Sequence, residues 1–133
     1  MSITLRDRAR ELTRPPVLVP PGDSLRRVAR TLWEESVGAA VVGTVEHPVG
    51  VISERDVVAQ LAQGADPDTV VAEDAMTRRV ISARPDDPLL DAAFIMLDDV
   101  IRHVPLDDED GTVTGMVSMR DLLPPLLVEA AGR

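Results

Sequence analysis

The side chains best able to do chemistry lie in a Ser-x-Arg-Asp motif that the chain carries twice. It reads GVISERDVV at residues 50–58 and GMVSMRDLL at residues 115–123. A serine that ends a strand and opens a helix points its hydroxyl the same way as the free N–H groups of the first helical turn, which favours an anion. The aspartate can accept two hydrogen bonds from a vicinal diol such as that of ribose, and the arginine can contact phosphate. The motif is therefore a candidate nucleotide-binding site.

The same spacing also predicts a capping box, which needs no ligand. In such a box the serine and the aspartate each accept a hydrogen bond from the other residue's backbone N–H. A helix cap of this kind contributes about 1 kcal/mol to stability. Because a duplication copies caps as readily as ligand sites, the second occurrence does not decide between the two interpretations.

The motif is repeated because the chain itself is a duplication. Residues 12–25 align with residues 76–89, and Thr13–Arg14 falls on Thr77–Arg78. Each half predicts the order strand–helix–strand–strand–helix. The predicted strands are 17–19, 39–43 and 49–52 in the first half, and 80–82, 103–106 and 113–117 in the second. A unit of about fifty residues is marginal alone, so the two halves are expected to pack together.

The first helix of each half is predicted to be amphipathic. The expected buried stripes are Leu25, Val28, Ala29, Leu32 and Trp33 in the first half, and Leu89, Ala92, Ala93, Met96, Leu97 and Val100 in the second. The second helices are expected to begin at Ser53 and Ser118, and Pro124–Pro125 should break the last one after about one turn. The connector 63–76 should hold a short helical segment, with residues 3–12 as its counterpart.

Composition narrows the class of function. Of 133 residues, 44% are hydrophobic but only 2% aromatic, so the core must be aliphatic. The formal net charge of −9 disfavours nucleic acid and anionic membranes as partners. The absence of cysteine excludes disulfides and thiolate metal sites. The N-terminus MSITLRDRAREL lacks the apolar run of a signal peptide, so a cytoplasmic location is expected.

The acidic run DDEDG at residues 107–111 is typical of a solvated hairpin turn. A calcium loop with its glycine at 111 would need an acid at 106 and a glutamate at 117, where Leu106 and Val117 stand. We expect Asp110–Gly111 to supply the positive-φ residues of the turn.

No residue set predicts catalysis or a metal site. The two histidines, His47 and His103, are isolated, so a zinc site is not expected. No serine is accompanied by the histidine and acid that a nucleophilic enzyme requires. Phe94 falls off its helix stripe and is either a lone exposed aromatic side chain or a dimer contact.

The chain resembles a tandem CBS-domain pair, also called a Bateman module, over about residues 7–128. The resemblance rests on VGVISERDVV, VTGMVSMRDLL, IRHVPLDDEDG, DAMTRRVISARPDD and the duplicated order of elements. It implies an α/β (α+β) fold of two β-α-β-β-α repeats about a pseudo-twofold axis, with mixed three-stranded sheets. The repeats would span residues 7–63 and 77–128, joined by a linker at 64–76.

In this family adenosine-containing ligands often occupy two clefts between the repeats. Carried over by position, one cleft would use Thr77, Val80, Ile81, Arg102, His103, Pro105, Ser118, Arg120 and Asp121. The other would use Thr13, Val17, Gly38, Ala39, Ala40, Ser53, Arg55 and Asp56. The second repeat is the favoured site because Arg102–His103 can attract phosphate where the first repeat has Gly38–Ala39.

The resemblance thus implies a stand-alone regulatory module that senses AMP, ADP or ATP and is not an enzyme. It requires no cofactor, forms a homodimer and acts through a separate effector protein. One alternative is an interaction or structural dimer with empty clefts, in which the Ser/Asp pairs serve only as caps. Another is a different adenosyl ligand, S-adenosylmethionine or NAD(H).

Overall fold

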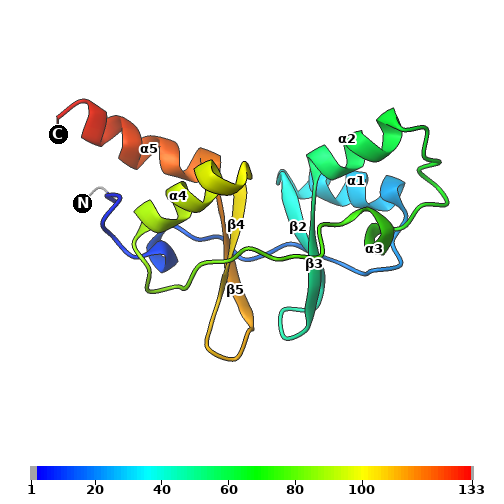
Figure 1. The fold of residues 1–133 in the computed structure, drawn as a ribbon, viewed down its shortest axis with the longest axis horizontal. Helices are drawn as coiled ribbons and strands as arrows, with labels where there is room; N and C mark the ends of the chain where they lie inside the picture. Colours follow the sequence, from blue (N-terminus) through cyan, green and yellow to red (C-terminus); the bar gives the residue numbers. More distant parts are fainter. Residues whose placement is uncertain (1–2, 133) are drawn as a thin grey trace. The chain divides into compact units, whose positions relative to one another are not determined.

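The computed structural model describes residues 3–132, which form two compact units (Figure 1). One unit is continuous in sequence, Pro16–Val80, and we call it the contiguous unit. The other combines residues 3–15 with residues 81–132, and we call it the split unit. Each unit has its own aliphatic core, so the chain passes out of the split unit and returns to it after completing the contiguous one.

The contiguous unit is a three-stranded sheet with helices. Its elements are β1 (Leu18–Val19), α1 (Leu25–Glu35), β2 (Ala39–Gly43), β3 (Pro48–Ser53), α2 (Glu54–Ala62) and α3 (Ala72–Ala75). Strand β2 is central, pairing parallel with β1 and antiparallel with β3. This mixed sheet and its helices confirm the predicted fold class.

The split unit repeats this plan with a shorter sheet. Its elements are the 3-10 helix η1 (Ala9–Glu11), α4 (Leu89–Asp99), β4 (His103–Asp107), β5 (Val113–Ser118) and α5 (Met119–Ala130). Strands β4 and β5 form an antiparallel pair. The predicted third strand at 80–82 is wrong, because only one parallel bridge, Ala83 with Leu106, stands where β1 lies in the other unit.

Proline explains the missing strand. In the contiguous unit the Val41 N–H donates to the Val17 carbonyl at 2.8 Å and extends β1. Position 41 corresponds to Pro105, which has no N–H to donate. The Ala83 N–H still donates to the Pro105 carbonyl at 3.0 Å, so pairing is reduced to a single bridge.

The buried stripes of α1 and α4 are narrower than predicted. Each helix buries one row, which is Leu25, Val28 and Leu32 in α1 and Leu89, Ala92 and Met96 in α4. Trp33 is 85% exposed and Leu97 is 73% exposed, so both were wrongly assigned to the core. Val100 does not belong to the helix stripe at all, because it ends α4 in the left-handed conformation with φ +56°.

The predicted break in the last helix is also wrong. Helix α5 runs without interruption through Pro124 and Pro125. The φ angle of proline suits a helix, so two adjacent prolines remove two backbone hydrogen bonds without ending it. Burial of Leu122 and Pro125 against the unit anchors the helix across this weak point.

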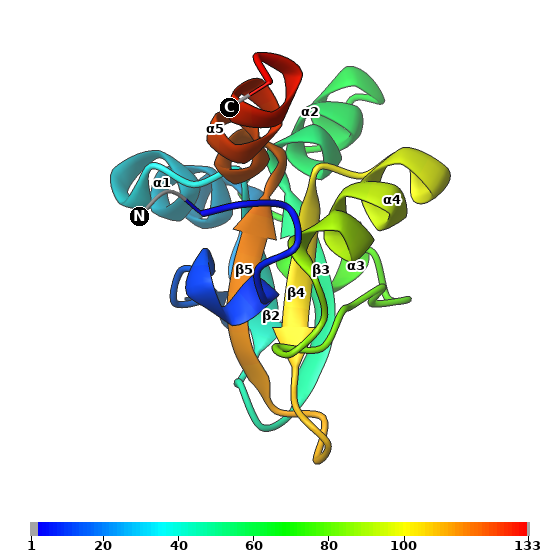
Figure 2. The same cartoon turned by 90° about the vertical axis from the view of Figure 1, so that its left-hand side faces the viewer.

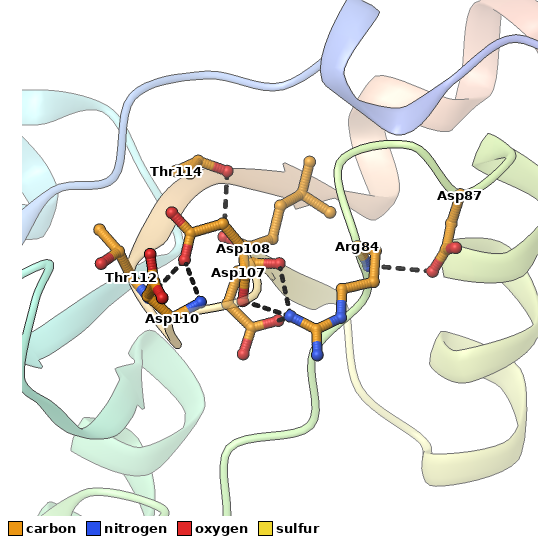
Figure 3. A network of polar contacts seen from close by, with 8 residues as sticks. Arg84, Asp87, Asp107, Asp108, Asp110, Thr112 and Thr114 are labelled. Atoms are coloured by element: carbon orange, nitrogen blue, oxygen red, sulfur yellow. Dashed lines mark hydrogen bonds and ion pairs between the residues drawn. The ribbon is translucent and has the colours of Figure 1, made fainter.

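The acidic hairpin turn is held by a network of polar contacts (Figure 3). The Asp108 carboxylate accepts hydrogen bonds from the backbone N–H groups of Asp110 and Thr112, at 2.9 and 3.0 Å. The Arg84 guanidinium donates to the carbonyls of Asp107 and Asp108 and ties the turn to the chain before α4. Gly111 has φ +80°, as predicted, whereas Asp110 does not have a positive φ.

No helix in the part of the chain that the structure describes is long and apolar enough to cross a membrane.

Candidate functional site

Both Ser-x-x-Asp motifs form complete capping boxes. In the contiguous unit Asp56 Oδ2 accepts from the Ser53 N–H at 2.8 Å, and Ser53 Oγ accepts from the Asp56 N–H at 3.2 Å. In the split unit the same two distances, for Asp121 and Ser118, are 2.9 and 3.3 Å. The capping interpretation is therefore confirmed in each repeat.

The strand pair of each unit sets the place of its cap. His103 lies opposite Ser118 at the end of the β4–β5 ladder, and the Met119 N–H donates to the Arg102 carbonyl at 2.7 Å. In the other unit Ala39 lies opposite Ser53, and the Glu54 N–H donates to the Gly38 carbonyl at 2.9 Å. Figure 2 shows α5 starting at the end of β5 that is remote from the hairpin turn. Each cap therefore lies beside the start of the neighbouring strand in both units.

The capping box uses only some of the hydrogen-bond acceptor positions of each aspartate carboxylate. A carboxylate has about four acceptor positions on two oxygens, and the box occupies only Oδ2. Oδ1 of Asp56 accepts no hydrogen bond and forms no ion pair with the residues that the structure describes. A vicinal diol can still reach a carboxylate in this state through its free oxygen.

The two caps differ in burial and in charge. The side chain of Asp121 is only 5% exposed, whereas Asp56 is half-buried. Oδ1 of Asp121 forms an ion pair with Arg14 Nη2 at 3.0 Å. A buried carboxylate needs such a counter-charge, because loss of hydration disfavours its ionised form.

In each unit an extended segment that carries a Thr-Arg pair passes very close to a glycine of the motif strand. The pair is Thr13–Arg14 beside Gly115 in one unit and Thr77–Arg78 beside Gly50 in the other. In the split unit Arg14 exchanges backbone hydrogen bonds with Met116, at 3.2 and 2.9 Å, and a Cβ on Gly115 would lie 1.9 Å from Thr13 Oγ1. In the contiguous unit Thr77 exchanges them with Val51, at 2.8 and 3.0 Å, and a Cβ on Gly50 would lie 2.7 Å from the Thr77 carbonyl oxygen. Only glycine fits at either crossing.

The family model described as "CBS domain" matches residues 9–63 and again residues 71–126. The chain belongs to the CBS-domain family. The CBS pair accounts for the duplicated motif, the duplicated caps and nearly the whole chain.

Solved CBS proteins are similar over most of their length. A CBS domain protein from Pyrobaculum aerophilum, complexed with AMP, is 36% identical with a TM-score of 0.83, covering 95% of this chain and 99% of that one. The CBS domain pair of protein MJ0100, in complex with 5′-methylthioadenosine and S-adenosyl-L-methionine, is 26% identical with a TM-score of 0.78. That match covers 87% of this chain and 96% of the other.

Curated relatives include longer proteins. An uncharacterized protein of Methanopyrus kandleri is 35% identical over 105 residues, which is 77% of this chain. The CBS pair spans about half of that relative, 54% of its length.

The CBS units divide the predicted ligand-binding residues differently from the sequence repeats. The split unit holds Thr13, Ile81, Arg102, His103, Pro105, Ser118, Arg120 and Asp121. The contiguous unit holds Val17, Gly38, Ala39, Ala40, Ser53, Arg55, Asp56, Thr77 and Val80. Thr13 and Thr77 are thus each in the unit opposite to their repeat's motif.

Arg14 is a site residue that the motif did not predict. The sequence signal for it is the Thr-Arg pair shared by the two halves of the CBS pair, which marks the position but not its partner. Its contact with Asp121 depends on a backbone pairing between residues about a hundred positions apart, which local sequence patterns do not encode. Among the described residues, no group of three or more His, Cys, Asp or Glu side chains is arranged to hold a metal ion.

Proposed function

We propose that this CBS pair is a regulatory module that binds an adenosine-containing ligand, with an adenine nucleotide as first candidate. The likeness to the AMP-complexed protein from Pyrobaculum aerophilum carries the proposal, since it extends over nearly all of both chains. The two capped carboxylates supply the chemistry, because each retains acceptor capacity for a ribose diol. No reaction is required, and we propose that the module is not an enzyme and needs no cofactor.

The Ser118–Asp121 cap is the first candidate position for the nucleotide. In the split unit Arg102 and Arg120 are exposed near this cap and can bind phosphate, while His103 lies opposite Ser118. In the contiguous unit the positions of Arg102 and His103 are held by Gly38 and Ala39, which provide no charge. The remaining predicted ligand-binding residues stay predictions.

The test is ligand binding by the nucleotide-free protein. We expect AMP, ADP or ATP to raise the melting temperature, because a ligand at 100 times its Kd stabilises by about 2.7 kcal/mol. Asp121→Ala should remove most of this shift and still show a cooperative melt, with Asp56→Ala as its matched control. Absence of binding at millimolar concentration to the wild-type protein would contradict the proposal.

A second function is favoured by the completeness of the capping boxes. Both motifs satisfy their own backbone without any ligand, and no buried side-chain polar atom in the described residues lacks a partner. On this interpretation the protein is an interaction or structural dimer whose sites stay empty. Calorimetry separates the two functions, because an interaction module gives no heat with any adenosine compound.

S-adenosylmethionine is an alternative ligand, because the similar protein MJ0100 was solved in complex with it. NAD(H) is another candidate that contains adenosine. Mass spectrometry of small molecules released from the purified protein distinguishes these compounds directly.

We also propose a homodimer built on the helices α4 and α5. Phe94, Leu97 and Leu127 on these helices are 54%, 73% and 65% exposed. Several exposed apolar side chains on two helices that contact one another favour a protein partner. Sedimentation should show a dimer that Leu97→Glu weakens, whereas Val49→Glu on β3 should not. A monomeric wild-type protein would contradict this arrangement. The effector protein and a cytoplasmic location stay predictions.

A further inference from the structure

Asp121 is the one buried charged residue among those described, and both of its oxygens are engaged. Oδ2 accepts from the Ser118 N–H and the Ser118 hydroxyl, each at 2.9 Å. Oδ1 pairs with Arg14 at 3.0 Å. Oδ2 already accepts two hydrogen bonds, so a ribose diol that donates both hydroxyls to this carboxylate must compete with Arg14 for the two acceptor positions of Oδ1.

Arg14 combines a fixed backbone with an exposed side chain. Its N–H and carbonyl both bond to Met116, which places its Cα beside β5. Its side chain is 69% exposed, so much of the guanidinium faces solvent. A guanidinium has five N–H donors in a planar fork that matches phosphate as well as carboxylate. The Arg14 guanidinium therefore contacts the buried carboxylate and is also accessible to a ligand from solvent.

The contiguous unit has the same arginine without the same contact. Arg78 corresponds to Arg14, yet its Nη2 donates to the Glu73 carbonyl at 3.3 Å. The cause is the backbone register, since Thr77 pairs with Val51 there whereas Arg14 itself pairs with Met116. A one-residue shift of an extended segment sends each side chain to the other face. Asp56 is consequently left without an ion pair among the described residues.

We propose that Arg14 is the specificity-determining residue of the Asp121 site and selects adenosine compounds that carry a phosphate. This inference rests on the proposed function. When the diol takes Oδ1, the guanidinium loses its anion, and a phosphate on the same ligand provides a new bidentate partner. Neutral adenosine or 5′-methylthioadenosine breaks the pair without replacing it. S-adenosylmethionine brings a cationic sulfonium instead. The Asp121 site therefore takes nucleotides, and the Asp56 site lacks this discrimination.

The test compares AMP with adenosine by calorimetry on the full chain carrying Asp56→Ala, so that only the Asp121 site remains. Charge-assisted hydrogen bonds are worth enough to give AMP an advantage of about 10-fold to 100-fold over adenosine. Arg14→Gln should reduce that ratio by about 3-fold or more, chiefly by weakening AMP, while Arg102 and Arg120 retain any share of the preference that they supply. Arg78→Gln, the matched control, should leave the ratio unchanged. Arg14→Lys keeps the charge without the fork and should give an intermediate ratio.

The outcomes separate this inference from the function on which it rests. If neither compound binds before Arg14 is changed, the proposed function fails. If both bind with equal affinity, or if Arg14→Gln weakens both equally, the proposed function stands and the role of Arg14 is overturned. A structural role for Arg14 would lower the melting temperature but leave the ratio of affinities unchanged. If Arg14→Gln does not fold, an unchanged ratio in the folded Arg14→Lys protein overturns the inference equally.

Discussion

The two units carry the same capping box but place different side chains beside it. In the split unit Arg14 pairs with Met116 and its side chain reaches Asp121, whereas in the contiguous unit Thr77 takes the equivalent pairing and Arg78 turns to the Glu73 carbonyl. The local motif has kept its hydrogen bonds in both copies, at distances that agree within 0.1 Å for the two backbone contacts. A register difference of one residue in a distant segment is therefore enough to make two equal motifs electrostatically unequal.

The largest expected losses of stability come from replacing Gly115 or Gly50, where a neighbouring segment passes too close for a Cβ atom. Gly115→Ala should cost about 3 kcal/mol, because its Cβ would overlap the side chain of Thr13. Gly50→Ala should cost a similar amount, because its Cβ would meet the Thr77 carbonyl oxygen as well as the Met76 sulfur. Urea unfolding of each variant gives these values.

Second substitutions distinguish the two crossings. Thr13→Gly should recover much of the stability lost in Gly115→Ala, since the obstacle there is a side chain. Met76→Ala should not rescue Gly50→Ala, since a backbone oxygen remains 2.7 Å away. If both second substitutions restored stability equally, the obstacle at Gly50 would also be a side chain, which would contradict this prediction.

The next effect is the loss of each aspartate. Asp121→Ala should lower the free energy of unfolding by about 2 kcal/mol and Asp56→Ala by about 1 kcal/mol. Both lose a cap, but water can replace the acceptor only at the half-buried Asp56. Chemical denaturation of the ligand-free proteins tests the order, and a larger loss at Asp56 would refute the assigned burial difference.

A smaller effect, this time a gain in stability, is expected when a proline of α5 is replaced by the alanine that α2 has at that position. Ala59 of α2 stands where α5 has Pro124, so Pro124→Ala supplies a donor for the Arg120 carbonyl. The expected gain is about 1 kcal/mol, since the loss of proline also loosens the unfolded chain. Pro125→Ala is the control, and burial of Pro125 should make its gain smaller. Thermal unfolding that favours Pro125→Ala would contradict this account.

The smallest effect concerns a surface pair that only the contiguous unit has. Arg26 donates to Asp68 at 2.6 and 3.1 Å, where the split unit has Leu90 in place of the arginine. The hydrogen bond from Arg26 lowers the pKa of Asp68 below its ordinary value. Any stabilisation from the pair is therefore present above the ordinary carboxyl pKa and is lost as the pH falls through the lowered value. Arg26→Gln should raise the Asp68 pKa in an NMR titration, with almost no change in the unfolding midpoint because both groups are exposed.

The sequence predicted what depends on neighbouring residues. The Ser-x-x-Asp spacing predicted both capping boxes, and short apolar runs joined by polar turns predicted the four paired strands of the two hairpins. Leu25, Val28 and Leu32 were correctly placed in the core, because they share one face of a single helix.

Features that depend on distant residues were missed. Arg14 pairs with Met116, a residue far away in the sequence, so no local sequence pattern predicts this pairing. Trp33 and Leu97 looked like core residues because periodicity finds an apolar face but not the width that a neighbouring element covers. The continuity of α5 through two prolines depends on tertiary packing of Leu122 and Pro125, which overrides their local preference.

The interleaved arrangement of the units also sets an order of events during synthesis. Residues 16–80 are all synthesised before most of the split unit, so the contiguous unit can emerge from the ribosome and fold while residues that follow 81 are still being added. Residues 3–15 emerge before the contiguous unit but must wait for β5 before Arg14 has a strand to pair with and can contact Asp121. Translation therefore allows the Asp56 cap to form before the Asp121 cap.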